Sequence, residues 1–221
     1  MKNKVFLIIV ASLLGAAAVF GLIFRFSYTN ITAEENYLDK LQVGEIPEGI
    51  CLVDCELLHQ SLPEAPLILR VTPVAELEQH FGRSIHKVVV RQTFVSEDVS
   101  VGDEIYITSD GWRAIIREDG WSIERHFVNV MREGSDYLVF LRDYEKIRWD
   151  GCTVYYLDEN RVIAPVFCYD DIPNIVIPES GGDTYVPYSE VRDNEFFAAS
   201  QAGLDAWLNL KQAMLAAYPR Q

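Results

Sequence analysis

The chain has 221 residues, with 33 acidic against 19 basic side chains and a formal net charge of -14. A surface of this sign repels phosphate backbones and anionic headgroups, which argues against nucleic acid as a partner. The length that follows Arg25 is enough for one domain with its own hydrophobic core.

The first predicted element is a membrane-spanning helix over residues 5–24. This stretch, VFLIIVASLLGAAAVFGLIF, contains no charged residue and lies between Lys4 and Arg25. At about 1.5 Å per residue it spans roughly 30 Å, the thickness of the hydrocarbon core of a bilayer. A cleaved signal peptide is the alternative, but cleavage after residues 16–18 (AAA) would leave residues 19–24 as an apolar new terminus. We therefore expect an uncleaved signal anchor.

The charges that flank residues 5–24 predict the orientation of the chain. Lys2 and Lys4 precede the segment, whereas Arg25 is followed by the acidic pair at residues 34–35. The positive-inside rule places the more basic flank in the cytoplasm. The prediction is a single-pass protein of the cell membrane, with a cytoplasmic tail at residues 1–4 and an extracytoplasmic main domain.

Residues 25–49 are expected to form a juxtamembrane helix and a linker. The run TAEE at residues 32–35 has the form of a capping box, and apolar residues follow at helical spacing, which predicts a short helix over residues 33–42. The run GEIPEG at residues 44–49 is typical of a loop. A second short helix is predicted after Asp54.

Residues 50–180 carry the pattern of a small β domain. Runs rich in branched and aromatic residues predict strands, and the Asp-Gly pairs at 110–111 and 119–120 predict tight hairpin turns. Residues 75–83 are expected to form a turn and a helix, and residues 174–178 an edge strand, because proline cannot donate within a central ladder. The remaining predicted strands are 66–74, 86–95, 104–109, 112–118, 121–127, 136–144, 152–157 and 161–168.

Four cysteines permit two disulfides in an exported domain. Cys152 and Cys168 lie opposite each other if the chain between them folds as an antiparallel hairpin. Cys51 and Cys55 are close enough to bond only if the chain turns or coils between them. We expect the pairs Cys51–Cys55 and Cys152–Cys168, and four buried free thiols are the alternative. No paired histidine motif follows Cys51 and Cys55, so no zinc site is predicted.

Residues 181–221 are expected to pack on the β domain as a helical segment. Apolar residues such as Leu204, Trp207 and Met214 recur near helical spacing and predict an amphipathic helix over residues 194–217. The expected fold class is mainly β (α+β). It comprises an N-terminal transmembrane helix, then a small antiparallel barrel or curled sheet, with a C-terminal amphipathic helix.

Four runs within the β domain carry a family resemblance. They are PLILRV at 66–71, VVVRQTFV at 88–95, VGDEIYI at 101–107 and MREGSDYLVFL at 131–141. With these runs, about half of the chain resembles the OB-like, netrin/tissue-inhibitor-like β-barrel of many uncharacterised exported bacterial proteins. The resemblance implies an OB-like barrel. Tissue-inhibitor-like domains place a cysteine at the mature N-terminus against a protease metal, whereas this chain begins with an apolar segment, so that activity is not carried over.

No catalytic constellation is assembled in the sequence. Ser180, in the run PESGGD, is similar to the Ser-Gly-Gly of trypsin-like enzymes. However, His59, His80, His86 and His126 lie in no recognisable base motif and have no metal-ligand spacing. The sequence favours a protein that is not an enzyme, with no catalytic residues, no cofactor and no metal.

Three aromatic residues form the candidate binding site. Trp112 and Trp121 each follow an Asp-Gly pair directly, and Tyr106 lies in the strand before them. If the three side chains faced outward on one sheet, they would form a platform for a sugar ring or a peptide. Large aromatic side chains are mostly buried, so the more ordinary interpretation is that they seal the ends of the barrel.

The expected function is that of a membrane-tethered extracytoplasmic binding or scaffold module, non-catalytic, whose partner is an envelope protein or a glycan. The alternative is a membrane-anchored hydrolase that acts on cell-envelope material, with acidic residues or Ser180 in its site. The alternative requires a deep cleft with convergent polar groups.

Overall fold

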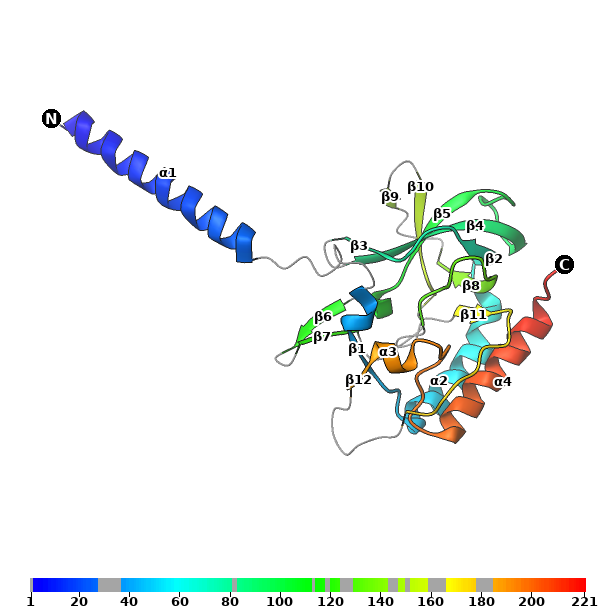
Figure 1. The fold of residues 1–221 in the computed structure, drawn as a ribbon. Coiled ribbons are helices and arrows are strands. Elements are labelled where there is room, and N and C mark those ends of the chain that lie inside the picture. Colours follow the sequence, from blue (N-terminus) through cyan, green and yellow to red (C-terminus); the bar gives the residue numbers. More distant parts are fainter. Residues whose placement is uncertain are drawn as a thin grey trace. The chain divides into compact units, whose positions relative to one another are not determined.

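The computed structural model describes residues 2–27, 37–80, 83–112, 114–117, 120–123, 129–142, 147–149, 152–158, 166–177 and 185–221. The chain divides into two compact units, Met1–Tyr37 and Leu38–Gln221, and the second unit is called the head domain below. The head domain combines helices with two β-sheets (Figure 1). The predicted combination of a curled sheet with helices is confirmed.

The first unit contains helix α1, Lys2–Ser27. The large apolar side chains that the structure describes on α1 are exposed, for example Phe6 and Leu13 at 66% and Phe24 at 72%. Among the described residues, no helix combines the length and the apolarity that a membrane crossing requires. The predicted transmembrane helix at residues 5–24 therefore has no support from the structure.

The larger sheet contains eight strands in the order β11-β8-β2-β4-β5-β10-β9, and β3 pairs with β4 outside this path. Branched apolar residues favour these strands, because their side chains pack well on a pleated surface. The strands are β2 (Leu67–Pro73), β3 (Glu78–His80), β4 (Arg83–Val95), β5 (Glu104–Thr108), β8 (Tyr137–Leu141), β9 (Ile147–Trp149), β10 (Cys152–Tyr156) and β11 (Val166–Cys168).

Two contacts curl this sheet around its core. β5 and β10 are parallel neighbours, whereas β2 pairs antiparallel with both β4 and β8. Beyond the ends of β8 and β10, Leu141 and Leu157 form an antiparallel bridge, and the N–H of Asp158 donates to the carbonyl of Phe140. The strands β2, β4, β5, β10 and β8 thus follow a curled path. Side chains at 0% exposure along it include Leu69, Val71, Val88, Val90, Ile107, Val139 and Leu141.

Two local predictions in this sheet are wrong. Residues 75–83 were expected to form a turn and a helix, but Glu78–His80 is the strand β3, which pairs with the start of β4. The expected hairpin between residues 152–157 and 161–168 is absent as well. β10 pairs with β5 and β9, whereas β11 pairs with β8. In both cases the backbone pairs with a strand that the local sequence pattern did not predict as its partner: β3 with β4, and β10 and β11 with strands other than each other.

The smaller sheet has the order β12-β1-β7-β6 and joins distant parts of the chain. β1 pairs antiparallel with β12 and parallel with β7. β1 comes from the predicted juxtamembrane linker and β12 from the predicted C-terminal segment, and both belong to the head domain. The strands are β1 (Gln42–Gly44), β6 (Ala114–Arg117), β7 (Gly120–Ile123) and β12 (Tyr185–Pro187).

Of the two predicted Asp-Gly hairpins, one forms. β6 and β7 pair antiparallel with Arg117 opposite Gly120, which confirms the second hairpin. At the first pair, residues 110–112 form the 3-10 helix η4 (Asp110–Trp112) instead, and β5 and β6 lie in different sheets. The N–H of Trp112 donates to the carbonyl of Ser109, so the chain turns away from β5 rather than back along it.

Helices α2 (Glu48–Ser61) and α4 (Gln201–Ala217) run side by side against the larger sheet (Figure 1). Helix α4 begins later than the predicted residue 194, because Ser200 is its N-cap and accepts the N–H of Gly203 at 3.1 Å. The shorter helices are η2 (Tyr37–Lys40), η3 (Leu62–Glu64) and α3 (Tyr188–Val191). Of the predicted helix at residues 33–42, the structure describes residues 37–42.

Aromatic side chains join α4 to the sheet. Phe196 stacks on Trp207 of α4 with ring centroids 5.0 Å apart. Phe167 of β11 contacts Phe196, and it also meets Phe140 of β8 edge to face at 6.2 Å. These side chains are at most 1% exposed, so they form a second core between the helices and the sheet.

Candidate functional site

The predicted aromatic platform is not exposed at two of its three residues. Trp112 is 1% exposed and Tyr106 4% exposed. Trp112 packs its ring edge to face against the buried His86, with centroids 5.3 Å apart, and Tyr106 joins a core cluster with Ile85. The backbone of Trp121 lies in β7, and its side chain lies outside the described residues. Trp112 and Tyr106 thus fill the interior, as the more ordinary interpretation expected.

Neither predicted disulfide is present. Cys51, Cys55 and Cys168 are buried free thiols. Cys51 and Cys55 lie on the buried face of α2, and Cys168 lies in β11, which pairs with β8. The three cysteine side chains therefore pack in the hydrophobic core. Burial raises the pKa of Cys51 to about 11, and it also raises the pKa of Cys55 and Cys168. Such thiols are protonated at neutral pH and are poor nucleophiles.

The residues considered for catalysis or metal binding are not gathered in the described part of the chain. Ser180 and His126 lie outside the described residues, as does the side chain of His80 in β3. His59 is exposed on α2, whereas His86 is buried in β4. Among the residues that the structure describes, no group of three His, Cys, Asp or Glu side chains is placed to hold a metal ion.

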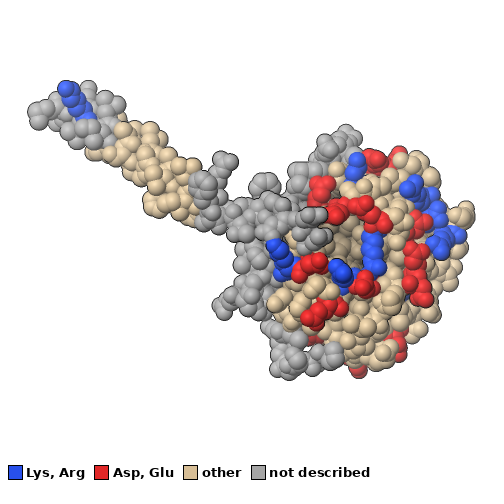
Figure 2. All heavy atoms as spheres, in the orientation of Figure 1, with Lys and Arg blue, Asp and Glu red and all other residues tan. Residues whose placement is uncertain are grey.

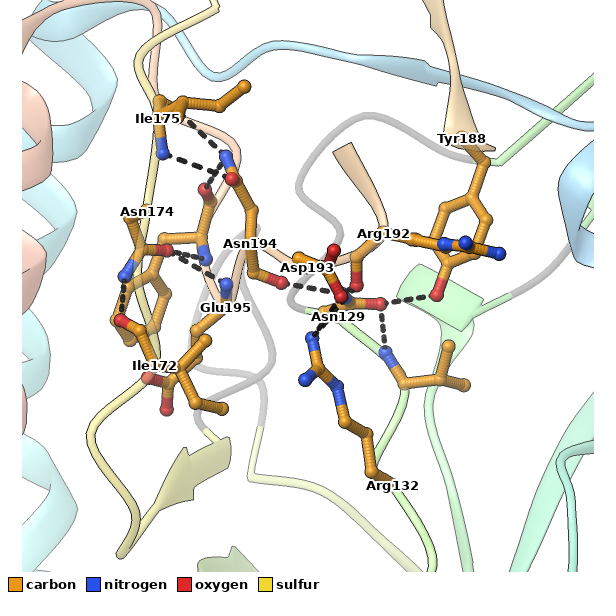
Figure 3. A network of polar contacts seen from close by, with 12 residues as sticks. Asn129, Arg132, Ile172, Asn174, Ile175, Tyr188, Arg192, Asp193, Asn194 and Glu195 are labelled. Carbon is orange, nitrogen blue, oxygen red and sulfur yellow. Dashed lines mark hydrogen bonds and ion pairs between the residues drawn. The ribbon is translucent and has the colours of Figure 1, made fainter. Parts of the chain in front are cut away.

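A network of asparagine side chains replaces regular secondary structure between the sheets and the helices (Figure 3). Asn129 donates to the carbonyls of Arg192 and Asn194, and its own side-chain oxygen accepts the hydroxyl of Tyr188. Asn194 exchanges two hydrogen bonds with the backbone of Ile175. Asn174 accepts the N–H groups of two residues after Asn194. These amides satisfy buried backbone groups, so their role is structural.

The same asparagine contacts explain why residues 174–178 are not an edge strand. The described residues 174–177 form no strand, and their backbone groups bond instead to Asn194 and, through Ile177, to the carbonyl of Ala198. Side-chain amides here take the place of the strand partner that the sequence pattern predicted.

A buried ion pair connects the free edge of β11 to α4. The ammonium of Lys211 lies 2.5 Å from Glu195, and the side chains are 10% and 3% exposed. Glu195 also accepts the N–H of Cys168, and Lys211 donates to the carbonyl of Asp170. Burial raises the pKa of the Glu195 carboxyl, and Lys211 acts in the opposite direction. Each charged group has partners within the fold, so the pair connects three segments of the chain.

The described residues form an open apolar groove between α2 and α4, which we call the α2–α4 groove. Its volume is about 240 Å³. Leu52 and the adjacent Val53 are 46% and 55% exposed, although both are large apolar side chains on a helix of a folded domain. The groove is lined by Leu52, Cys55, Glu56 and His59 of α2 and by Ala206, Asn209, Leu210 and Ala213 of α4.

A close approach of the two helices forms one end of this surface. A Cβ atom added to Gly203 of α4 would lie 3.2 Å from both Cβ and Sγ of Cys51 of α2. Glycine therefore lets the two helix backbones approach here. Further along, the small side chains of Ala206 and Ala213 leave the space that the α2–α4 groove occupies.

A second hollow lies beside the larger sheet, where β2 begins and β4 ends. It has a volume of about 430 Å³ between the ends of β2 and β4, and its lining includes Glu64, Glu97 and Asp98 together with Pro63 and Pro66. Elsewhere the charges are mixed, and Figure 2 shows acidic and basic side chains interspersed on one face of the molecule. Such a mixture is typical of a solvated surface.

Sequence reasoning missed the α2–α4 groove. The signal that can find it is the pair LV at residues 52–53, which follows Cys51 within a helix and leaves apolar side chains on two faces. A helix with apolar residues on two faces needs a partner on each. The predicted start of the helix after Asp54 left these residues outside it.

The comparisons with known proteins give no match: no protein-family model matches the chain, and no curated protein is significantly similar to it.

Proposed function

We propose that the protein is a membrane-tethered extracytoplasmic binding module, and that the α2–α4 groove is the surface on which an envelope protein docks. The observation that carries the proposal is the groove itself, with Leu52 exposed in its lining and the neighbouring Val53 of α2 exposed as well. Apolar surface of this kind, bordered by polar side chains, marks sites of protein interaction in soluble domains.

The tether is inferred from the sequence of residues 5–24 and from the exposed apolar side chains of α1. The uncharged run follows Lys2 and Lys4, which favours a cytoplasmic N-terminus and a head domain outside the cytoplasm. Exposed groups such as Phe20 at 63% and Phe24 at 72% would be hidden from water by lipid.

The head domain is proposed to be an OB-like barrel. Support comes from the path β2-β4-β5-β10-β8, which has one parallel pair and returns near its start at Leu141 and Leu157. A five-stranded, partly open barrel is the architecture of OB folds, whose members include many binding proteins. This similarity of architecture adds to the proposal of a binding module, and it assigns no ligand.

Crosslinking in the host cell tests this proposal. The full chain and its Ala213→Trp variant are treated with a membrane-permeable crosslinker, extracted with detergent and isolated under denaturing conditions. Because the indole fills the groove, we expect the wild type to yield a defined envelope protein in the membrane fraction and the variant to lose it. Recovery of the same protein at equal yield from both would contradict the groove as the docking surface.

The hydrolase alternative gives a different result in the same preparations. The purified full chain in detergent is incubated with isolated cell-envelope material, and soluble fragments are quantified over time. A non-catalytic module releases no more fragments than buffer alone. Release that Ser180→Ala abolishes would replace the binding proposal with an envelope hydrolase.

A further inference from the structure

We infer that the occupant of the α2–α4 groove is a basic amphipathic helix of the partner protein. The inference rests on the proposed function, because it names the partner class for that surface. It is carried by the charge and the shape of the surface that α2 and α4 present.

The exposed charges on the two helices are of one sign. Helix α2 contains no lysine or arginine, and the one lysine of α4, Lys211, is buried against Glu195. Glu48, Glu56 and Asp205 are exposed carboxylates on the same pair of helices. Lysine or arginine on a docked segment would therefore meet carboxylates, and no exposed lysine or arginine of α2 or α4 would compete with it.

The groove has the shape that receives a third helix. Leu52, Glu56 and His59 lie along α2, and Ala206, Asn209 and Ala213 lie along α4, each set at helical spacing. Seven residues of helix extend over about 10 Å, so roughly two turns of a docked helix can face the groove. An apolar side chain from that helix enters between Leu210 and Leu52, while its flanking residues face Glu56.

The same charges disfavour the two other occupants. An anionic lipid surface would be repelled by Glu48, Glu56 and Asp205, because no exposed lysine or arginine of α2 or α4 offsets them. A second copy of the chain would bring the same carboxylates together across a two-fold interface. A cationic partner removes this repulsion and leaves the apolar contact.

A surface of two helical turns is small, which has a consequence for affinity. Interfaces well below about 1,200 Å² in total are typical of weak and transient complexes. Tethering both partners to one membrane raises their effective concentration, so a weak contact is sufficient there. We therefore expect binding of isolated peptides to be weak but selective.

Model peptides test the inference without knowledge of the partner. Three dye-labelled peptides of equal length are titrated with the full chain in nanodiscs of uncharged lipid, and empty nanodiscs give the background. One is an amphipathic leucine/lysine helix, one has glutamate in place of each lysine, and one is a scrambled leucine/lysine sequence without an apolar face. Fluorescence anisotropy measures each dissociation constant. We expect the first peptide to bind at least tenfold more tightly than the other two.

Matched variants test whether the peptide binds in the α2–α4 groove. Glu56→Lys and Ala213→Trp are expected to weaken binding of the amphipathic lysine peptide at least fivefold, whereas Glu97→Lys, which lines the second hollow and not the groove, changes it less than twofold. Unfolding temperatures within a band of about 2 °C around that of the wild type show that each variant is folded. A variant outside this band is replaced by Asn209→Lys.

Three outcomes overturn the inference. They are equal binding of the lysine and glutamate peptides, equal binding of the scrambled peptide, and a larger effect of Glu97→Lys than of Ala213→Trp. These failures are distinct from failure of the proposed function. If the cell yields a groove-dependent partner that lacks a basic amphipathic helix, the binding module stands and the partner class is wrong.

Discussion

His86 and the Glu195–Lys211 pair place ionisable groups in the interior of the head domain, where each affects stability. The pair is nearly dry, with Glu195 at 3% exposure, and it connects α4 to the segment after β11. A buried ion pair adds little net stability when intact, because desolvation offsets the attraction, but loss of one partner leaves a buried charge. His86, at 1% exposure, stays neutral beside Trp112.

Lys211→Met is expected to destabilise the head domain by about 3 kcal/mol, because Glu195 then loses its buried cation. Urea denaturation of the full chain, followed by tryptophan fluorescence, measures the change. The control is Arg192→Met, which removes the exposed pair between Arg192 and Asp39 at 3.6 Å. That loss is expected to cost less than about 1 kcal/mol. Similar effects of the two substitutions would show that burial does not set the energy of the Lys211 pair.

The stability of the head domain is expected to depend on pH through His86. Burial lowers the pKa of His86 from 6.5 to about 3, with a weak opposing effect from the backbone of Ala75. Between these values the unfolded chain binds a proton that the folded chain does not, so stability is full above pH 6.5 and falls as the pH is lowered towards 3. The loss is on the order of 1.4 kcal/mol for each pH unit in that window.

His86→Phe removes this component and keeps a flat apolar ring against Trp112. The difference in unfolding free energy between wild type and variant is measured at pH 7 and at pH 5. We expect it to change by more than 1 kcal/mol, on the order of the linkage estimate. The exposed His59→Phe is the control, with no such change expected. A pH-independent difference for His86→Phe would contradict the assignment.

Among the elements, the contact between α2 and α4 decides the shape of the groove that we propose as the docking surface. Gly203 lets α4 approach Cys51, while Ala206 and Ala213 leave the groove open beyond that contact. The residues that follow α4 hold its end on the sheet: Tyr218 packs against Phe94 with centroids 5.3 Å apart, and its carbonyl accepts the hydroxyl of Tyr169. Helix α4 is thus fixed at both ends.

Gly203→Val is expected to destabilise the head domain by about 2 kcal/mol, because the added methyl groups overlap Cys51 in a closely packed contact. Thermal unfolding of the full chain measures it. Gly49→Val in α2 is the matched control, since a Cβ at Gly49 meets no atom within 4 Å. That control is expected to be neutral or slightly stabilising. A neutral effect at Gly203 would mean that the helices separate at little cost.

Local patterns predicted several strands well and their pairing poorly. β2, β5 and β8 fall within predicted runs, because branched residues there have strong strand preference, whereas β4 begins at Arg83, three residues before its predicted run. The partners of β10 and β11 depend on contacts between residues far apart in the sequence, so the predicted hairpin at Cys152 and Cys168 was wrong. Helix α4 begins at Gln201 and not at the predicted residue 194. Asn194 bonds to the carbonyl of Phe196 within the asparagine network, and Ser200 is the N-cap of the helix.

The candidate site was less accessible to prediction than the strands. Aromatic residues after Asp-Gly pairs suggested a platform, yet Trp112 turns inward because η4 replaces the expected hairpin. The α2–α4 groove depends on which side chains two distant helices leave uncovered, and the local pair LV at residues 52–53 contains only part of that information. Leu52 and Val53 become informative only when the packing of α2 is known.

The whole molecule combines an apolar N-terminal helix with an acidic head domain, whose described residues include the apolar α2–α4 groove. The whole chain carries a net charge of -14, and a charge of this sign favours cationic partners. Attachment to a membrane would confine head domain and partner to one surface, where a small contact is effective. The tether and the groove are thus proposed to act together.

The tether is tested by placing charge within residues 5–24. The double substitution Leu13→Arg and Leu14→Arg is expected to release the protein from membranes, because each arginine at the centre of a spanning helix costs about 3 kcal/mol. Alkaline washing of isolated membranes, followed by immunoblotting, measures retention. Val101→Arg on the head domain, at a position 64% exposed, is the control and should stay bound. Equal retention of both variants would contradict a membrane-spanning role for α1.

The most direct test of the account is photo-crosslinking from a benzophenone amino acid placed at Asn209, inside the groove, in living host cells. We predict a single crosslinked product in the membrane fraction, lost when Ala213→Trp is added and absent when the benzophenone is placed at Val101. A product that forms equally well from Val101, or that survives Ala213→Trp, would contradict the α2–α4 groove as the docking surface.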